Sequence, residues 1–111
     1  MSLLKVTTTN SFEDDVLRSS IPVLIDFHAV WCGPCKASAP ALEDAAREFE
    51  GEVAFVKVDI DQESELAEAY GVQSVPTFIL IKDGAPVERF IGLISRGKLA
   101  SVLEPYTGGG Q

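Results

Sequence analysis

A buried-strand pattern that leads directly into two closely spaced cysteines is the feature of this sequence that most constrains the fold. Residues 23–30, Val-Leu-Ile-Asp-Phe-His-Ala-Val, are almost continuously apolar, which is typical of a strand covered on both faces. Trp31-Cys32-Gly33-Pro34-Cys35 follows at once. Because proline suits the first turn of a helix, a helix is expected from Pro34 to about Glu50, with Gly51 ending it. Pro40 lies inside this helix and should kink it.

Further strands and helices are predicted on both sides of this unit. The apolar patterns indicate strands at residues 3–7, 53–60, 77–82 and 86–91, and helices at 11–19, 64–70 and 95–104. Ser11 is expected to cap the first helix, and Asp83-Gly84-Ala85 is a hairpin signal between the last two strands. This order predicts an α/β fold: a mixed five-stranded central sheet with about four helices on both faces.

The length and charge of the chain restrict its organisation and its partners. With 111 residues it has room for one domain, expected over residues 1–106, and we interpret the Gly-rich end at 107–111 as a disordered tail. The net charge is −8, and the nine basic residues do not cluster. We therefore expect neither nucleic acid nor a membrane as a partner, and attribute the acidity to a solvated surface.

The start of the chain and its cysteine count indicate the compartment. Residues 1–7 lack the basic and apolar regions of a secretory signal, and no apolar run approaches the roughly 18 residues of a membrane span. We therefore expect a cytoplasmic protein. Two cysteines and the single His28 are too few for a four-ligand zinc site, so no metal is expected. A close cysteine pair in a reducing compartment indicates redox chemistry.

The two cysteines can form a disulfide because Gly33-Pro34 allows the chain to turn tightly between them. The sulfur of Cys32 would then lie at a helix N-terminus, where unpaired amides and the helix dipole lower the pKa of a thiol. We therefore predict that Cys32 is the nucleophile and that Cys35, one turn inside the helix and shielded, is the resolving thiol. Cys32 would attack a target disulfide, and Cys35 would then release the reduced target.

Together these stretches resemble the thioredoxin family over about residues 3–105. The matching segments are Asp26-Phe27, Trp31 to Lys36, Pro40, Lys57-Val58-Asp59, Val75-Pro76-Thr77, Gly84 and Gly92. The resemblance implies the thioredoxin fold and a protein disulfide reductase that holds no cofactor besides its Cys32–Cys35 disulfide. It also implies electrons from NADPH through a thioredoxin reductase, an NADPH flavoprotein or else a ferredoxin-linked enzyme, and disulfide-containing proteins as substrates. We expect the chain to be a monomer.

The resemblance also implies roles for a charged pair. Asp26 resembles the buried acid that assists proton transfer at Cys35, and Lys57 resembles its charged neighbour. Both interrupt apolar strands, and a buried charge usually needs a partner or a shifted pKa. The alternative is that either side chain reaches the rim of the sheet as a solvated group.

Substrate contact is implied for a third set of residues. Pro76 resembles the family's cis-proline, with the Val75 backbone pairing with an extended substrate. An apolar contact patch is expected from Trp31, Gly33, Pro34, Val75, Pro76 and Gly92. Three of these residues have a simpler alternative: Trp31 could fill the core, Pro76 could merely open a strand, and Gly92 could only permit a tight backbone.

Two positions depart from the family pattern. His28 stands where tryptophan is common, on the same face of its strand as Asp26. Either it couples the pH dependence of exchange to its own charge, or it only forms hydrogen bonds at the end of the sheet. Ala37-Ser38 is smaller and more polar than the usual apolar pair, which makes it a candidate determinant of partner docking.

Two other functions remain open. A thiol oxidase or isomerase would use the same cysteines, but Gly-Pro between them favours a reductant, because a histidine there would stabilise the thiolate. A scaffold subunit of a larger complex could have the same fold, although it would not require the cysteine pair or Asp26.

Overall fold

The structure is a computed structural model that describes residues 2–107. The part of the predicted tail at 108–111 therefore lies outside the described residues. Thr107, which the sequence places in that tail, is hydrogen-bonded: its backbone N–H and its hydroxyl both donate to the Glu104 carbonyl, at 3.2 and 2.9 Å.

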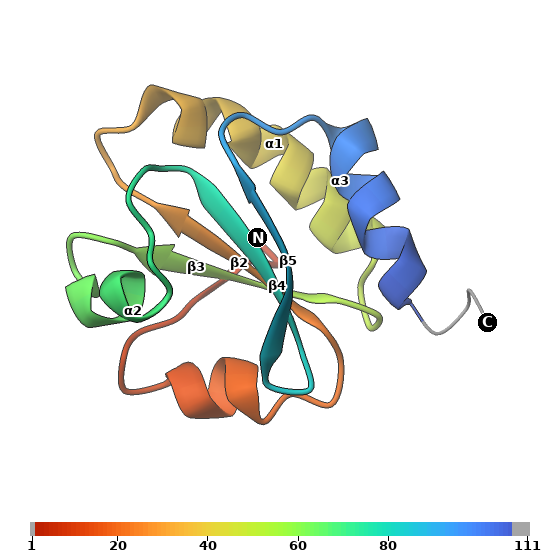
Figure 1. Cartoon of the computed structure of the whole chain (residues 1–111). Helices are drawn as coiled ribbons and strands as arrows, with labels where there is room; N and C mark the ends of the chain where they lie inside the picture. The colour runs from red at the N-terminus through yellow and green to blue at the C-terminus, as the bar shows by residue number, and fades with distance from the viewer. Residues whose placement is uncertain (1, 108–111) are drawn as a thin grey trace.

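Five strands form one mixed sheet in the order β1-β3-β2-β4-β5 (Figure 1). The strands are β1 (Lys5–Val6), β2 (Val23–His28), β3 (Ala54–Asp59), β4 (Thr77–Lys82) and β5 (Ala85–Ile91). The central strand β2 runs parallel to β3 and antiparallel to β4. The predicted mixed five-stranded sheet is therefore confirmed.

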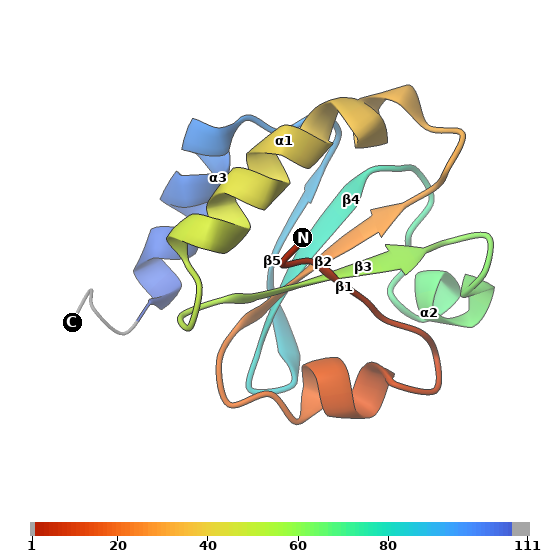
Figure 2. The same cartoon turned by 180° about the vertical axis from the view of Figure 1, so that it is seen from behind.

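Helices cover both faces of the sheet, as Figures 1 and 2 show from opposite sides. The helices are η1 (Glu13–Leu17), α1 (Gly33–Glu48), α2 (Ser64–Ala69) and α3 (Arg96–Leu103), followed by the short turn of helix η2 (Glu104–Tyr106). α1 and α3 lie side by side on one face, and η1 and α2 lie on the other. The predicted α/β architecture with helices on both faces is confirmed.

Two apolar cores explain why β2 is almost continuously apolar. Successive side chains of a strand point to opposite faces, so Leu24 packs in the core beneath α1 and α3, while Ile25 and Phe27 pack in the core beneath η1 and α2. All three are fully buried. Because helices cover both faces, no position along β2 except Asp26 and the terminal His28 carries a polar side chain.

Three local expectations need correction. β2 ends at His28, and Val30, predicted to continue the buried strand, has 68% of its surface exposed. The first strand is shorter than predicted, Lys5–Val6. Ser11 does not cap a helix: η1 begins later, with Phe12 before its first residue, and the Ser11 hydroxyl accepts the Thr8 N–H at 3.1 Å instead. Such local side-chain bonds compete with helix capping.

Candidate active site

The two cysteines lie where β2 passes into α1. Cys32 precedes the first residue of α1 in an extended conformation, and its Sγ accepts the backbone N–H of Cys35 at 3.1 Å. Pro34 occupies the first turn, as its fixed backbone angle favours. The cysteines form a disulfide with their Cα atoms 5.3 Å apart, an ordinary separation for such a bond. Helix α1 therefore presents its unpaired N-terminal amides to Cys32.

The expected contrast in exposure between the two cysteines is absent in this disulfide form. Cys32 is 4% exposed and Cys35 is 8% exposed, so both are buried. Ala29 and the partly buried Val75 pack against the pair, and the Val75 carbonyl oxygen lies 3.7 Å from Cys32 Sγ. What distinguishes the two sulfurs is their place on the helix, since only Cys32 caps it and accepts an amide.

The loop before β4 brings a second segment to the disulfide. The Val75–Pro76 peptide bond is cis, as the resemblance implies. Pro76 is buried, and its carbonyl accepts the Gly92 N–H at 2.9 Å. Gly92 has a φ of +98°, a conformation that glycine adopts without strain. Val75, Pro76 and Gly92, which are far apart in sequence from the cysteines, therefore lie together beside Cys32.

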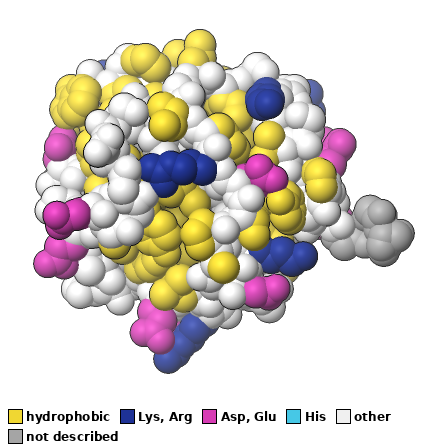
Figure 3. Space-filling view, viewed as in Figure 1, with side chains coloured by type: hydrophobic (Ala, Val, Ile, Leu, Met, Phe, Trp, Pro, Cys, Tyr) yellow, Lys and Arg dark blue, Asp and Glu magenta, His cyan; other side chains and the backbone are white. Residues whose placement is uncertain are grey.

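Four large apolar side chains near the disulfide are exposed: Val30 (68%), Trp31 (65%), Ile91 (62%) and Leu93 (66%). Figure 3 shows hydrophobic side chains at the upper margin, over the start of α1 and the turn before it. The Trp31 indole N–H donates to Asp61 at 2.8 Å, which holds the ring in place. The alternative of Trp31 as core filler is therefore wrong. We call Val30, Trp31, Ile91 and Leu93 the apolar rim.

Sequence reasoning missed Asp61 and three residues of the apolar rim, Val30, Ile91 and Leu93. Ile91 and Leu93 flank Gly92, so an apolar pair around a singled-out glycine was an available signal. Asp61 carries no comparable signal, because only the fold brings it to Trp31. Gly33 and Pro34, which were expected to contribute to substrate contact, are exposed between the cysteines.

A buried carboxyl group lies behind the disulfide. Asp26 is 4% exposed, and its Oδ1 has no hydrogen-bond partner among residues 2–107. Burial raises the pKa of Asp26 from its ordinary 3.8 to about 7, against the opposing effect of the Lys57 charge. The alternative of a solvated Asp26 at the sheet rim is therefore wrong. Lys57 pairs in register with Asp26 on β3 and is half-buried.

A cavity of about 250 Å³ lies between the Asp26 carboxyl group and Cys35. Its lining includes Asp26, Cys35, Lys57 and His28. This volume can hold water, and polar groups from both strands face it. Asp26 and Cys35 thus share one cavity on the face of the sheet that α1 covers.

His28 lies at the end of β2, opposite Asp59 of β3. It is half-buried and lines both the cavity of Asp26 and a neighbouring hollow of about 320 Å³ that contains Asp59 and Lys57. Desolvation, and secondarily the Lys57 charge, lowers the pKa of His28, while Asp59 acts in the opposite direction. The imidazole forms no hydrogen bond with any residue of the described chain, 2–107.

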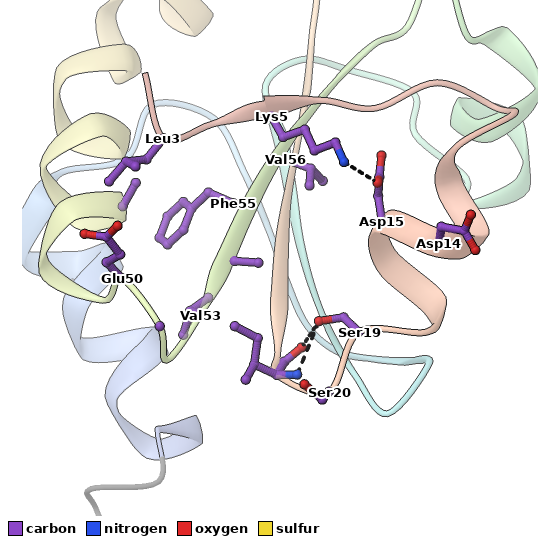
Figure 4. Close-up of a pocket in the computed structure, with 14 residues that line it drawn as sticks. Leu3, Lys5, Asp14, Asp15, Ser19, Ser20, Glu50, Val53, Phe55 and Val56 are labelled. Atoms are coloured by element: carbon purple, nitrogen blue, oxygen red, sulfur yellow. Dashed lines mark hydrogen bonds and ion pairs between the residues drawn. The ribbon is translucent and has the colours of Figure 1, made fainter. Parts of the chain in front are cut away.

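Other hollows contain no comparable chemistry. The hollow in Figure 4, about 530 Å³, lies near the amino ends of β2 and β3, away from the cysteines, and its walls include Leu3, Lys5, Asp15 and Phe55. Over residues 2–107, no three His, Cys, Asp or Glu side chains are grouped so that they could hold a metal ion. None of the helices in that same part of the chain combines the length and the hydropathy needed to span a membrane.

Comparisons with known proteins agree over nearly the whole chain. A family model described as Thioredoxin matches residues 3–105. Thioredoxin 1 of Synechococcus elongatus is 40% identical over 106 residues, which cover 96% of this chain and 99% of that protein. A Mycolicibacterium smegmatis thioredoxin is 50% identical over 99 residues, 87% of each chain. A Mycobacterium tuberculosis thioredoxin is 48% identical over 101 residues, 91% of this chain and 84% of its own.

Proposed function

The chain belongs to the thioredoxin family and is a dithiol–disulfide oxidoreductase that reduces protein disulfides. We propose that Cys32 is its nucleophile and that Cys35 is its resolving thiol. One observation carries this assignment. The sulfur of Cys32 alone caps α1 and accepts an amide hydrogen bond, from Cys35, at 3.1 Å. A hydrogen bond to the charged form and the helix dipole both stabilise a thiolate at this position.

The reaction then runs in two exchange steps. The Cys32 thiolate attacks one sulfur of the target disulfide, which forms a mixed disulfide and releases the other target sulfur as a thiolate. Cys35 loses its proton and attacks Cys32 Sγ, which breaks the mixed disulfide and forms the Cys32–Cys35 disulfide. The target leaves as a dithiol with the two electrons that the cysteine pair has lost.

We assign Asp26 as the group that accepts the proton that Cys35 loses. Its carboxyl group shares the 250 Å³ cavity with Cys35, and a pKa of about 7 lets it accept a proton near neutrality. Lys57, directly opposite on β3, stabilises the ionised carboxylate and so prevents its pKa from rising further. The pair tunes proton transfer and does not contact the target.

An extended segment of the target would lie across the apolar rim. The exposed Trp31 directly precedes Cys32, and the exposed Ile91 and Leu93 flank Gly92, which is hydrogen-bonded to Pro76. A partner that covers these side chains would therefore come close to Cys32. A target backbone can come close to Cys32 where no large side chain stands in the way. The residues that leave this room are the Val75 backbone and Pro76 beside Cys32, and Gly92, Gly33 and Pro34. Apolar contact and backbone pairing suit many unrelated targets, which fits a general reductant.

Membership of the family supports a proposal for the electron donor and for the setting in which the protein works. We assign a thioredoxin reductase as the donor, taking electrons from NADPH through a flavoprotein, and a cytoplasmic monomer as the working form. A ferredoxin-linked reductase is the alternative donor. Adding a purified NADPH-dependent flavoprotein thioredoxin reductase and recording NADPH oxidation at 340 nm separates the two donors.

His28 is proposed to modulate the pH dependence of exchange. It lies two residues after Asp26 on β2, which puts both side chains on the same face, and it lines the same cavity. Protonation of His28 below its lowered pKa would add positive charge there and favour the Asp26 carboxylate. The pH–rate profile of His28→Trp should therefore shift at its acidic limb, and an unchanged profile would remove this role.

The reduction potential of the cysteine pair is the first test of the physiological direction. We expect a value at or below the cytosolic glutathione poise of about −220 to −260 mV, measured against dithiol buffers with Trp31 fluorescence. A value well above that poise would indicate an oxidase or isomerase. A Cys32→Ser, Cys35→Ser double variant that still supports the biological role would instead indicate a scaffold.

A further inference from the structure

Ser38 is a buried hydroxyl residue one helical turn beyond Cys35. It lies within α1, three residues after Cys35, and its side chain is fully buried. A hydroxyl group in an apolar surrounding is costly unless it is hydrogen-bonded. The Ser38 Oγ accepts the backbone N–H of Ile94 at 3.3 Å, and Ile94 itself is 5% exposed. Because Ser38 is buried, an effect of this residue on partner docking has to be indirect.

The segment that Ser38 holds is the one that carries part of the apolar rim. The chain from Gly92 to Ser95 connects β5 with α3. Gly92 donates its N–H to Pro76 at 2.9 Å, Ile94 donates to Ser38, and the Ser95 hydroxyl accepts the Lys98 N–H to cap α3. Leu93 lies between the first two of these bonds and is 66% exposed. The backbone on both sides of Leu93 is therefore held, by the bond of Gly92 to the Pro76 carbonyl and by the bond of Ile94 to the Ser38 hydroxyl.

We propose that Ser38 is a positioning residue for protein substrates, because its hydroxyl ties the Gly92–Ile94 segment to the same helix that carries Cys35. An apolar side chain at position 38 would leave the buried Ile94 N–H without this partner. Serine satisfies that donor from inside the core. The inference rests on the proposed role of the apolar rim in substrate contact.

The test compares the docking of a protein disulfide with the chemistry of a small one. The reduced protein is mixed with insulin or with bis(2-hydroxyethyl) disulfide, and its oxidation is followed by Trp31 fluorescence. For Ser38→Ala we expect the half-saturating insulin concentration to rise about fivefold, as expected for the loss of one buried hydrogen bond. The limiting rate and the rate with the small disulfide should stay within about twofold of the parent values, and the reduction potential should not change. The reason is that the Ser38 hydroxyl bonds to Ile94 and not to either sulfur atom.

Matched variants separate positioning from a general loss of stability. Ser38→Thr keeps the hydroxyl and should restore the parent half-saturating concentration. Thr7→Val removes another buried hydroxyl, which donates to Asp15 at 2.9 Å, and should lower stability without changing that concentration. An unchanged half-saturating concentration in Ser38→Ala, or an equal rise in Thr7→Val, overturns the proposal. So does an equal loss with the small disulfide.

Two further measurements keep the test decisive. Leu93→Ser should itself raise the half-saturating insulin concentration; if it does not, the apolar rim has no docking role and the proposal for Ser38 falls with it. If it does and Ser38→Ala has no effect, only the Ser38 inference fails. In the unaltered protein, amide hydrogen exchange at Ile94 should be at least about 100-fold slower than at Leu93, as a buried hydrogen-bonded amide requires. Equal exchange rates would overturn the proposal even if Ser38→Ala does not fold.

Discussion

Asp26 is a carboxyl group that the fold keeps away from water, with one oxygen unpartnered among residues 2–107. Its pKa, about 7 in the folded chain, lies above its ordinary 3.8, so the folded state binds the proton more tightly than the unfolded state does. The contribution of Asp26 to the free energy of unfolding should therefore be greatest below about pH 4 and be lost as the pH rises towards 7. At roughly 1.36 kcal/mol per pH unit, the penalty above pH 7 is at most about 4 kcal/mol.

Asp26→Asn should remove this penalty. We expect the variant to be more stable than the parent at pH 8 in urea unfolding, with a difference that shrinks as the pH falls to 4. Its second exchange step should be slower at pH 7, on the order of 10- to 100-fold, because the proton acceptor for Cys35 is lost. A stability difference that does not vary with pH would contradict the raised pKa.

Asp15 offers a control of opposite sign. Its pKa is lowered, chiefly by the hydrogen bond from Lys5, so it stabilises the fold above its ordinary pKa and this contribution is lost as the pH falls through its folded value. Asp15→Asn should therefore be less stable than the parent at neutral pH and approach it in acid. The same urea series, run on both variants, should give pH trends in opposite directions.

The two cysteines should respond differently to replacement by serine. In Cys35→Ser the first exchange step remains, but no thiol can release the target, so a mixed disulfide with insulin should accumulate. Cys32→Ser lacks the nucleophile that caps α1, and should form far less of it. Non-reducing electrophoresis and intact mass measure both adducts. Equal trapping by the two variants would contradict the assignment of roles.

At the level of elements, hydrophobic pattern and turn residues predicted most of the fold correctly. The strand predicted at residues 77–82 agrees residue for residue with β4, because Pro76 directly precedes it and Asp83-Gly84 directly follows it. Asp83 and Gly84 both have positive φ, which the two-residue turn requires and Asp-Gly readily adopts. The predicted helix cap at Ser11 was wrong because its hydroxyl bonds to the nearby Thr8 amide instead. The predicted end of the strand was wrong at Val30 because this apolar residue is exposed.

The end of α2 is held by two hydrogen bonds that the hydrophobic pattern of the sequence does not reveal. The Arg89 guanidinium of β5 donates to the carbonyls of Tyr70 and Gly71, at 2.7 and 2.8 Å, where α2 ends. Terminal helix carbonyls have no partner within the helix, so this fork satisfies the carbonyl of the C-cap residue Tyr70. It also holds Gly71, the next residue, in the loop that leads to Pro76. β5 and α2 are thereby joined across the sheet edge.

Arg89→Lys should weaken this junction because lysine cannot donate in the same forked geometry. We expect a loss of about 1–2 kcal/mol in the free energy of unfolding, measured by urea at pH 7. Arg18→Lys is the matched control, since Arg18 forms only exposed ion pairs with Glu13 and Asp14 on η1 and should change stability by less than about 0.5 kcal/mol. A similar loss in both variants would contradict the role given to Arg89.

Across the whole molecule, the site is assembled from segments that no local pattern connects. The cysteine pair was predictable because its chemistry depends on the spacing within one turn and one helix. The contacts of Trp31 with Asp61, of Gly92 with Pro76, and of Ile94 with Ser38 each join residues at least 16 positions apart. Such pairs follow from the strand order and helix packing, which sequence patterns specify only as a fold class.

The disulfide links the redox state to the stability of the whole chain. It closes a loop of four residues, from Cys32 to Cys35, and the chain-entropy model for so short a loop gives about 2 kcal/mol of stabilisation. The oxidised protein should therefore unfold at higher urea concentration than the protein reduced with dithiothreitol, with the same dependence on urea.

By the thermodynamic cycle, the folded pair should then be harder to reduce than the unfolded pair by roughly 40 mV, since about 30 mV corresponds to 1.4 kcal/mol for two electrons. Urea unfolding followed by far-ultraviolet circular dichroism at pH 7, and dithiol equilibration of the folded and the urea-unfolded chain, measure the two sides of the cycle independently. The Cys32→Ser, Cys35→Ser double variant should unfold like the reduced protein whether or not dithiothreitol is present. If the reduced protein proved the more stable form, the folded pair would be easier to reduce than the unfolded one, and the fold would favour the dithiol.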